Sequence, residues 1–322
     1  MKSLKGKIPM SNLKNEQYIN RIYHTDALEF LPKLEDDSID LILTDPPYFL
    51  DKLDEKWSPE KVSNKKNLYT VKSLPAGMKF DKEQGKNLYK WFLKVSQEAF
   101  RILKPGGFFL SFSSPRLYHR MATAMDDSGF LIKDCFLWIY TQNQAKAMSL
   151  DHFIQKAPIP QQQREKIKKK FQNWKTPQIK SCFEPIAVAQ KPTEGTFLSN
   201  MLKYEVGLVN TSLKTGENMF PSNILTTESI NAIMDRYFLV PKPTKKEKGF
   251  SNNHLTVKPL SLCEQLIKLL TFSKEAVVLD PFVGSGTTVV AAKHLKRKFI
   301  GCDINQEYIK ITEARLQKQE LF

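Results

Sequence analysis

The apolar positions of the chain fall into two patterns that alternate along much of its length. Short continuous apolar runs, typical of buried strands, occupy residues 18–24, 41–44, 108–112, 130–140, 276–279 and 299–303. Apolar residues at helical spacing occupy residues 27–34, 88–103, 117–125, 260–270, 287–295 and 304–319. Strands and helices that alternate in this way predict an α/β fold, with a mostly parallel sheet covered by helices on both faces.

Two regions interrupt this alternation. Residues 51–87 are charged and lack periodicity, which predicts a long loop, and loops of this length commonly have a function or move. In residues 141–250 glutamine, asparagine, proline and lysine become frequent and the periodicity fades. We therefore expect residues 18–140 and 251–322 to build the sheet, with 141–250 inserted between its two parts.

The apolar run that begins at Leu41 ends in residues with distinctive chemistry. It leads into Asp45, Pro46, Pro47 and Tyr48, which places a carboxylate, a rigid kink and an aromatic ring at one point. An exocyclic amine of a nucleobase is a poor nucleophile because its lone pair is conjugated with the ring. The Asp45 carboxylate and the Pro46 carbonyl can accept hydrogen bonds from such an amine and free that lone pair, while Tyr48 stacks on a base that has left the duplex. The alternative is that Asp-Pro-Pro only ends a strand.

Residues 276–288 repeat this arrangement with glycines. An apolar strand again ends in Asp-Pro, at Asp280, and Phe-Val-Gly-Ser-Gly and a helix-forming run follow. Gly284 and Gly286 let the backbone approach a ligand closely. Because no Gly-Lys-Ser/Thr follows, the motif does not imply a triphosphate site.

Together the two motifs resemble the signatures of the amino-directed DNA methyltransferases that use S-adenosylmethionine. Members of that family carry an Asp-Pro-Pro-Tyr catalytic motif and a Phe-x-Gly-x-Gly cofactor motif. Here the catalytic motif comes first and the cofactor motif last, with a long insert between them, an order that resembles the β class. The resemblance implies a Rossmann-like methyltransferase fold, with both motifs at neighbouring strand ends, and a target-recognition region in 141–250. Because the loop over 51–87 directly follows the Asp-Pro-Pro-Tyr motif, it is placed to fold over the substrate base; the alternative is disorder without a role.

The resemblance further implies a set of cofactor-binding residues. Asp26, in Thr-Asp-Ala, matches the segment whose acid reaches the cofactor adenine, although a helix N-cap is an equal alternative. Residues 254–259, His-Leu-Thr-Val-Lys-Pro, resemble the His-Pro-Thr-x-Lys-Pro motif beside the methionine end of the cofactor, with Leu255 replacing the proline. Asp303 ends a strand about 20 residues after the glycines, where a carboxylate can bind ribose hydroxyls. The expected cofactor-binding residues are Asp26, Thr256, Lys258, Asp280, Phe282, Gly284, Ser285, Gly286, Thr287 and Asp303.

The charge of the chain suggests a polyanionic partner. Its 322 residues include 49 Lys and Arg against 34 Asp and Glu, a net charge of +15, for which solubility alone is the alternative explanation. Residues 161–180 hold seven basic residues and one acid, with two aromatic residues interleaved. This pattern favours a surface that grips phosphates, the alternative being a solvated helix face. The expected DNA-binding residues are Lys168, Lys169, Lys170, Trp174 and Lys175.

The remaining features narrow the class of protein. No secretory signal or bilayer-spanning run is visible. The four cysteines, Cys135, Cys182, Cys263 and Cys302, lie far apart, which argues against a metal site and favours free thiols in a reducing cytoplasm. None of them follows a proline, so the Pro-Cys nucleophile of carbon-5 cytosine methyltransferases is absent.

We therefore expect a cytoplasmic, site-specific methyltransferase that acts on the N6 amine of adenine in double-stranded DNA. The Asp before Pro-Pro-Tyr favours adenine, with cytosine N4 as the alternative. The basic insert and the motif order disfavour an RNA or protein-amide methyltransferase, and the intact motifs disfavour a DNA-binding protein that has lost catalysis. The resemblance implies a restriction–modification setting, with a cognate restriction endonuclease and a homodimer as further partners.

Overall fold

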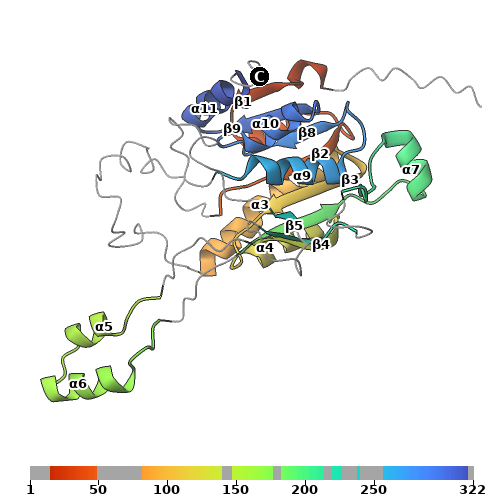
Figure 1. The fold of residues 1–322 in the computed structure, drawn as a ribbon. Coiled ribbons are helices and arrows are strands. Elements are labelled where there is room, and N and C mark those ends of the chain that lie inside the picture. Colours follow the sequence, from red (N-terminus) through yellow and green to blue (C-terminus); the bar gives the residue numbers. More distant parts are fainter. Residues whose placement is uncertain are drawn as a thin grey trace, which may run out of the picture.

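The computed structural model describes residues 15–48, 82–139, 147–176, 183–213, 220–226, 238–239 and 257–317. Its strands are β1 (Arg21–His24), β2 (Ile39–Thr44), β3 (Leu103–Phe112), β4 (Leu131–Ile139), β5 (Phe183–Gln190), β6 (Ile224–Thr226), β7 (Phe238–Leu239), β8 (Val277–Asp280) and β9 (Lys298–Asp303). They form one nine-stranded sheet in the order β1-β9-β8-β2-β3-β5-β4-β6-β7 (Figure 1). All neighbouring pairs are parallel except the two that include β5, which confirms the expected mostly parallel sheet.

Helices cover both faces of this sheet. One face carries α1 (Ala27–Phe30), α3 (Lys82–Ile102) and α4 (Tyr118–Asp127). The other carries α9 (Leu260–Leu270), α10 (Thr287–His294) and α11 (Gln306–Gln317). The remaining helices described are η1 (Glu16–Tyr18), η2 (Leu31–Lys33), α5 (Asp151–Lys156), α6 (Gln161–Lys170) and α7 (Phe197–Tyr204).

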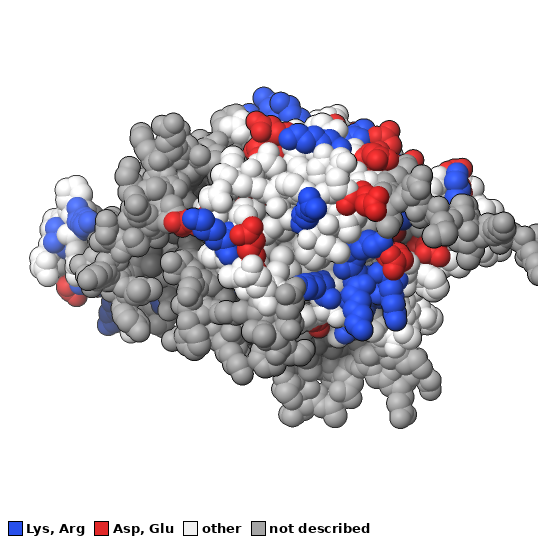
Figure 2. Space-filling view, turned by 90° about the horizontal axis from the view of Figure 1, so that it is seen from above, with Lys and Arg blue, Asp and Glu red and all other residues white. Residues whose placement is uncertain are grey.

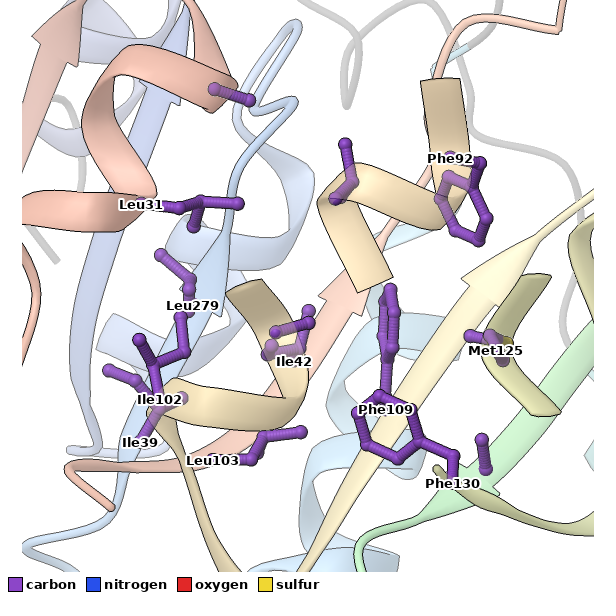
Figure 3. Packing of buried hydrophobic residues seen from close by; sticks show 14 of the residues in the cluster. Leu31, Ile39, Ile42, Phe92, Ile102, Leu103, Phe109, Met125, Phe130 and Leu279 are labelled. Carbon is purple, nitrogen blue, oxygen red and sulfur yellow. The ribbon is translucent and has the colours of Figure 1, made fainter. Parts of the chain in front are cut away.

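Two hydrophobic cores lie on the two faces, because successive side chains of a strand point to opposite sides of the sheet. Ile42 of β2 and Phe109 of β3 pack with Phe92 of α3 in the first core (Figure 3). Leu41 and Leu110, each one position away, pack in the second core with α9 and α10. The continuous apolar runs in the sequence therefore reflect strands that are buried on both faces.

Three boundaries differ from the sequence predictions. Helix α3 begins at Lys82, so the last residues of the expected 51–87 loop are helical, and residues 49–81 lie outside the described part of the chain. The helix expected over 27–34 divides into α1 and η2, where Pro32 lacks the N–H that a continuing α-helix needs. Strand β3 starts at Leu103 and continues, with a shifted register against β2, through the Lys-Pro-Gly-Gly segment that was expected to separate helix from strand.

Strand β5 comes from the region between the two expected parts of the sheet. It lies between β3 and β4, and its residues from Pro185 to Gln190 are buried. The sheet therefore recruits residues from 141–250, and β6 and β7 extend it further. The domain boundaries at residues 140 and 250 stay a prediction.

Residues 147–176 form a helical lobe that stands away from the sheet (Figure 1). Its helices α5 and α6 pack against each other. The two ends of the lobe are joined where Ser149 bridges Lys175 and where the Met148 N–H donates to the Thr176 hydroxyl at 2.9 Å. This lobe contains most of the basic stretch identified in the sequence.

A buried carboxylate on β2 joins three strands of the sheet. One oxygen of Asp40 lies 2.8 Å from the Lys104 ammonium of β3, and the other accepts the Val277 N–H of β8 at 2.7 Å. Burial raises the pKa of Asp40, and the nearby Lys104 charge opposes that rise. The carboxylate is thus a central connection between the two parts of the sheet.

We predict that Asp40→Ala lowers the free energy of unfolding by about 3 kcal/mol or more, because it leaves Lys104 and the Val277 N–H without their partner. Urea-induced unfolding measures the change. The matched control is Glu275→Ala, which breaks a pair with Lys298 in which the Glu275 side chain is 73% exposed. The control should lose much less stability. Equal losses in the two variants would contradict a central role for Asp40.

Candidate active site

The carboxyl ends of three neighbouring strands bring together residues that are far apart in the sequence. Strands β9, β8 and β2 lie side by side and parallel, and Asp303, Asp280 and Asp45 stand at or directly after their ends. The Thr44 hydroxyl of β2 donates to the Asp280 carboxylate at 2.7 Å. The Asp-Pro-Pro-Tyr segment and the glycine segment therefore meet at one edge of the sheet, as expected from the strand pattern.

Asp45 is held by two side chains. The Tyr48 hydroxyl donates to one of its oxygens, and the Lys258 ammonium pairs with the other. Asp45 and Tyr48 are both half-buried, and Pro46 is buried. The turn made by the two prolines thus brings Tyr48 back to the Asp45 carboxylate, so that the acid and the aromatic residue are in direct contact.

Lys258 is a buried cation between two acids. Its side chain is 8% exposed, its ammonium lies 3.2 Å from the Glu184 carboxylate of β5, and it lies 4.9 Å from the centre of the Phe112 ring. Burial acts to lower the pKa of Lys258, but the charges of Asp45 and Glu184 outweigh it and the pKa is raised. The ammonium is therefore charged. Glu184 was not identified from the sequence, because nothing in its local pattern distinguishes it from a solvent-facing strand residue.

Asp280 is a buried acid that connects the end of β8 to the end of β2. It is 3% exposed and accepts the Phe282 N–H at 3.1 Å in addition to the Thr44 hydroxyl. Burial raises the pKa of Asp280 to about 7, against the opposing effect of its hydrogen bonds. Phe282, which follows it, packs its ring 5.2 Å from that of Trp91.

The glycine loop is clamped by the last helix. Gly284 and Gly286 have φ angles of 50° and 83°, a left-handed conformation that glycine adopts readily. The buried Thr312 hydroxyl of α11 donates to the Gly284 carbonyl at 2.9 Å, and the Arg315 guanidinium donates to the Ser285 carbonyl at 2.5 Å. The loop leads into α10 at Thr287. The two hydrogen bonds from α11 hold the loop backbone in its conformation. Thr312 and Arg315 were not identified from the sequence.

Asp303 is joined to the same loop. One of its oxygens accepts the Gly284 N–H at 2.8 Å, and the other accepts the Asn305 N–H at 2.8 Å. Burial raises the pKa of Asp303, and these two backbone donors oppose that rise. Each carboxylate oxygen has a second lone pair, so the acid retains capacity to accept hydroxyl groups of a ligand.

Asp26 is a helix N-cap, which was the alternative interpretation of this residue. Its carboxylate accepts the Leu28 N–H at 2.8 Å and thus caps helix α1. The cap uses one carboxylate oxygen, and it leaves the proposed contact with the cofactor adenine as a prediction.

Other expected site residues lie elsewhere. Thr256 falls outside the described residues. Lys168, Lys169 and Lys170 belong to α6, and Trp174 and Lys175 follow it, so all five lie in the 147–176 lobe and not at the strand ends. Trp174 is 70% exposed. The expected sites thus separate into a group of acids and glycines at the strand ends and a basic lobe apart from the sheet.

The described residues lack the features of two other kinds of site. Among them, no cluster of three or more His, Cys, Asp and Glu side chains has the arrangement of a metal site. None of the described helices has the length and apolar character required to cross a membrane.

The fold and the site define an α/β methyltransferase of the Rossmann type: a glycine loop and an acid follow consecutive parallel strands, and Asp-Pro-Pro-Tyr follows the next one. The sequence profile of the family described as DNA methylase matches residues 39–314. The chain belongs to this DNA methylase family.

Individual relatives extend over nearly the whole chain. It is 32% identical over 316 residues to the Type II methyltransferase M.HindIII of Haemophilus influenzae, which covers 92% of this chain and 95% of the relative. It is 27% identical over 311 residues to the DNA adenine methyltransferase YhdJ of Escherichia coli, covering 92% of this chain and 82% of the relative.

Solved structures confirm the fold. The crystal structure of the M1.HpyAVI–SAM complex superposes with a TM-score of 0.52 at 22% identity, covering 92% of this chain and 98% of the other. The PvuII DNA methyltransferase, described as cytosine-N4-specific, gives a TM-score of 0.55 at 19% identity, covering 92% of this chain and 85% of the other.

We predict that Gly286→Ala weakens S-adenosylmethionine binding by about tenfold or more, or about 1.4 kcal/mol. A Cβ at Gly286 would lie 2.4 Å from Cγ2 of Thr312, at a φ of 83° that alanine disfavours. Calorimetry measures the affinity.

The control for this variant is Gly85→Ala. A Cβ at this position in α3 would meet the Arg120 side chain at an ordinary 3.5 Å, so binding should be unchanged and helix stability should rise by up to about 1 kcal/mol. Equal cofactor affinity in wild type and Gly286→Ala would show that the glycine loop does not form the cofactor site.

Proposed function

We propose that this protein transfers a methyl group from S-adenosylmethionine to the N6 amine of adenine in double-stranded DNA. The observation that carries the proposal is the position of the Asp45 carboxylate. It stands with Tyr48 at the end of β2, one strand away from the end of β8, where the glycine loop begins. A methyl donor on the loop and an amine at Asp45 would therefore be neighbours.

The residues of the Asp-Pro-Pro-Tyr segment prepare the amine for attack. The Asp45 carboxylate and the Pro46 carbonyl accept its two hydrogen bonds, and Tyr48 stacks on the flipped base, with Pro47 fixing the turn between them. S-adenosylmethionine supplies a sulfonium methyl carbon, to which the amine nitrogen bonds as the carbon–sulfur bond breaks, leaving S-adenosylhomocysteine and releasing one amine proton to solvent. Positioning and electrostatics therefore carry most of the rate enhancement.

The residues around the glycine loop fit this methyl donor. The Asp303 carboxylate, half-buried beside Gly284, binds the ribose hydroxyls, and Asp26 approaches the adenine ring from the start of α1. Phe282, Ser285 and Thr287 belong to the segment from the end of β8 at Asp280 to the start of α10, and we propose that this segment contacts the cofactor. Lys258 is expected at the methionine end together with Thr256. Its ammonium pairs with Asp45, which supports the proposal that donor and acceptor meet beside this pair.

Adenine is the proposed target because an Asp precedes Pro-Pro-Tyr and because a relative that matches 92% of this chain is described as a DNA adenine methyltransferase. The cytosine-N4-specific description of the PvuII enzyme makes cytosine the second candidate. Identification of the methylated nucleoside distinguishes the two.

The 147–176 lobe is the proposed grip on DNA. On the face of the body seen in Figure 2, basic side chains stand among acidic ones, apart from one denser basic group. Helix α6 instead carries Lys166, Lys168, Lys169 and Lys170 against the single acid Glu165, and the only ion pair described there, between Lys168 and Glu165, is 3.7 Å long. A large excess of positive charge on an outlying lobe suits contact with a phosphate backbone.

The biological setting follows from the relatives. Because M.HindIII is described as a Type II methyltransferase, we propose that this enzyme acts in restriction–modification. A cognate restriction endonuclease, a homodimer and a cytoplasmic location stay predictions.

The function is tested by incubating the protein with labelled S-adenosylmethionine and duplex DNA, followed by digestion and identification of the modified nucleoside. We expect N6-methyladenine from the wild type and less than a tenth of its turnover from Asp45→Asn, because the amide cannot accept a charge-assisted hydrogen bond from the amine. Cofactor affinity should stay within a few-fold.

The matched control is Asp126→Asn, at an exposed acid of α4, which should keep full turnover. N4-methylcytosine as the product would replace adenine by cytosine in the proposal. Full turnover by Asp45→Asn would remove Asp45 from its role.

We expect the triple variant Lys168→Gln, Lys169→Gln, Lys170→Gln to bind cognate and non-cognate duplexes more weakly by the same factor, since phosphate contacts carry no sequence information. The slope of log affinity against log salt should become shallower by about 0.9 for each phosphate that the protein no longer neutralises. Anisotropy titrations over a range of salt concentrations measure both quantities.

A control triple variant at Lys33, Lys274 and Lys296, exposed lysines that precede β2, β8 and β9, makes the same change in net charge and should leave the slope unchanged. An unchanged slope in the lobe variant would identify α6 as a solvated helix face. A loss of affinity confined to the cognate duplex would make these lysines base readers.

A further inference from the structure

Strand β5 brings a second carboxylate to the catalytic edge. Because β5 runs antiparallel to β3, its first residues lie where the parallel strands end. The Ser113 N–H, directly after β3, donates to the Pro185 carbonyl at 2.9 Å and fixes this start of β5 against the end of β3. Pro185 also restricts the residue before it to an extended conformation. Glu184 is therefore presented from a rigid backbone.

Lys258 links the Glu184 side chain to the Asp45 carboxylate. The Lys258 ammonium lies 3.2 Å from Glu184, pairs with Asp45 and lies over the Phe112 ring. A buried cation keeps its place only where opposite charges surround it. With an acid on either side and a ring on a third, the ammonium has one favourable position, and that position orients the Asp45 carboxylate.

The balance of charge gives Glu184 a second effect. Lys258 paired with Asp45 alone would cancel the negative charge beside the acceptor amine. With Glu184 the three groups together carry one net negative charge. The methyl donor is cationic and the amine nitrogen gains positive charge as it is methylated, so a net negative site stabilises the transition state.

We propose that Glu184 is a positioning residue for methyl transfer, which acts through Lys258 to orient the Asp45 carboxylate and to keep the catalytic edge net negative. The proposal rests on the proposed methyltransferase function. It assigns no contact between Glu184 and the base or the cofactor.

The test compares Glu184→Gln and Glu184→Asp with the wild type in single-turnover methylation of duplex DNA. The glutamine variant keeps the shape and loses the charge, and we expect its rate constant to fall by about tenfold or more. The aspartate variant keeps the charge and should recover part of the rate. Affinities for S-adenosylmethionine and for DNA should stay within a few-fold in both variants, a split that general damage to the fold would not produce.

The same substitution in a Lys258→Met background tests whether Glu184 acts through the lysine. There Glu184→Gln should cause little further loss of rate, because the effects of interacting residues are not additive. A fully additive loss, full activity of Glu184→Gln, or a parallel loss of cofactor affinity would each overturn the proposal.

The wild-type product separates this proposal from the proposed function. An active wild type with a fully active Glu184→Gln overturns only the role of Glu184. N4-methylcytosine as the product overturns only the choice of adenine. An inactive wild type overturns both.

Discussion

The arrangement of the strand ends depends on one buried cation and the acids that pair with it. Lys258 lies between Asp45 and Glu184, and the buried Asp280 accepts the Thr44 hydroxyl. Leaving Lys258 without its partners costs several kcal/mol, because its buried charge has lost its hydration. The constraint fixes the ends of β2, β5 and β8 relative to one another. The proposed function uses these same acids, so in that proposal stability and reactivity depend on a single set of contacts.

The sequence located the candidate residues that a local pattern marks. Asp45 and the glycines could be found because a strand that ends in Asp-Pro, or in Asp-Pro followed by Gly-x-Gly, leaves a recognisable pattern. Glu184, Thr312 and Arg315 left none. Each acts on a residue distant in the chain, and its neighbours in sequence are those of an ordinary strand or helix. Their partners become visible only when the sheet order is known.

The boundaries of the fold show the same division. The alternation of apolar runs and helical stripes placed most elements, since buried strands and amphipathic helices differ in period. It did not place β5 in the middle of the sheet, because the composition of 141–250 is polar on average. An apolar run also does not indicate which strands lie beside it in the sheet. Asp26 illustrates a different limit: its carboxylate caps α1, and a local sequence pattern cannot distinguish a helix cap from a ligand contact.

The contact between Thr44 and Asp280 joins residues 236 positions apart, and this separation has a consequence for biosynthesis. A ribosome releases β2 and Asp45 long before β8, the glycine loop and the α11 residues that clamp it. Until then β2 lacks its neighbour on one side, and the nascent chain exposes an unpaired strand edge to chaperones or to other chains. Contacts of such long range also slow folding. An incomplete translation product that ends before β8 therefore carries Asp45 without the Asp280 carboxylate and the glycine loop, so the edge of the sheet described above forms only when the chain is nearly complete.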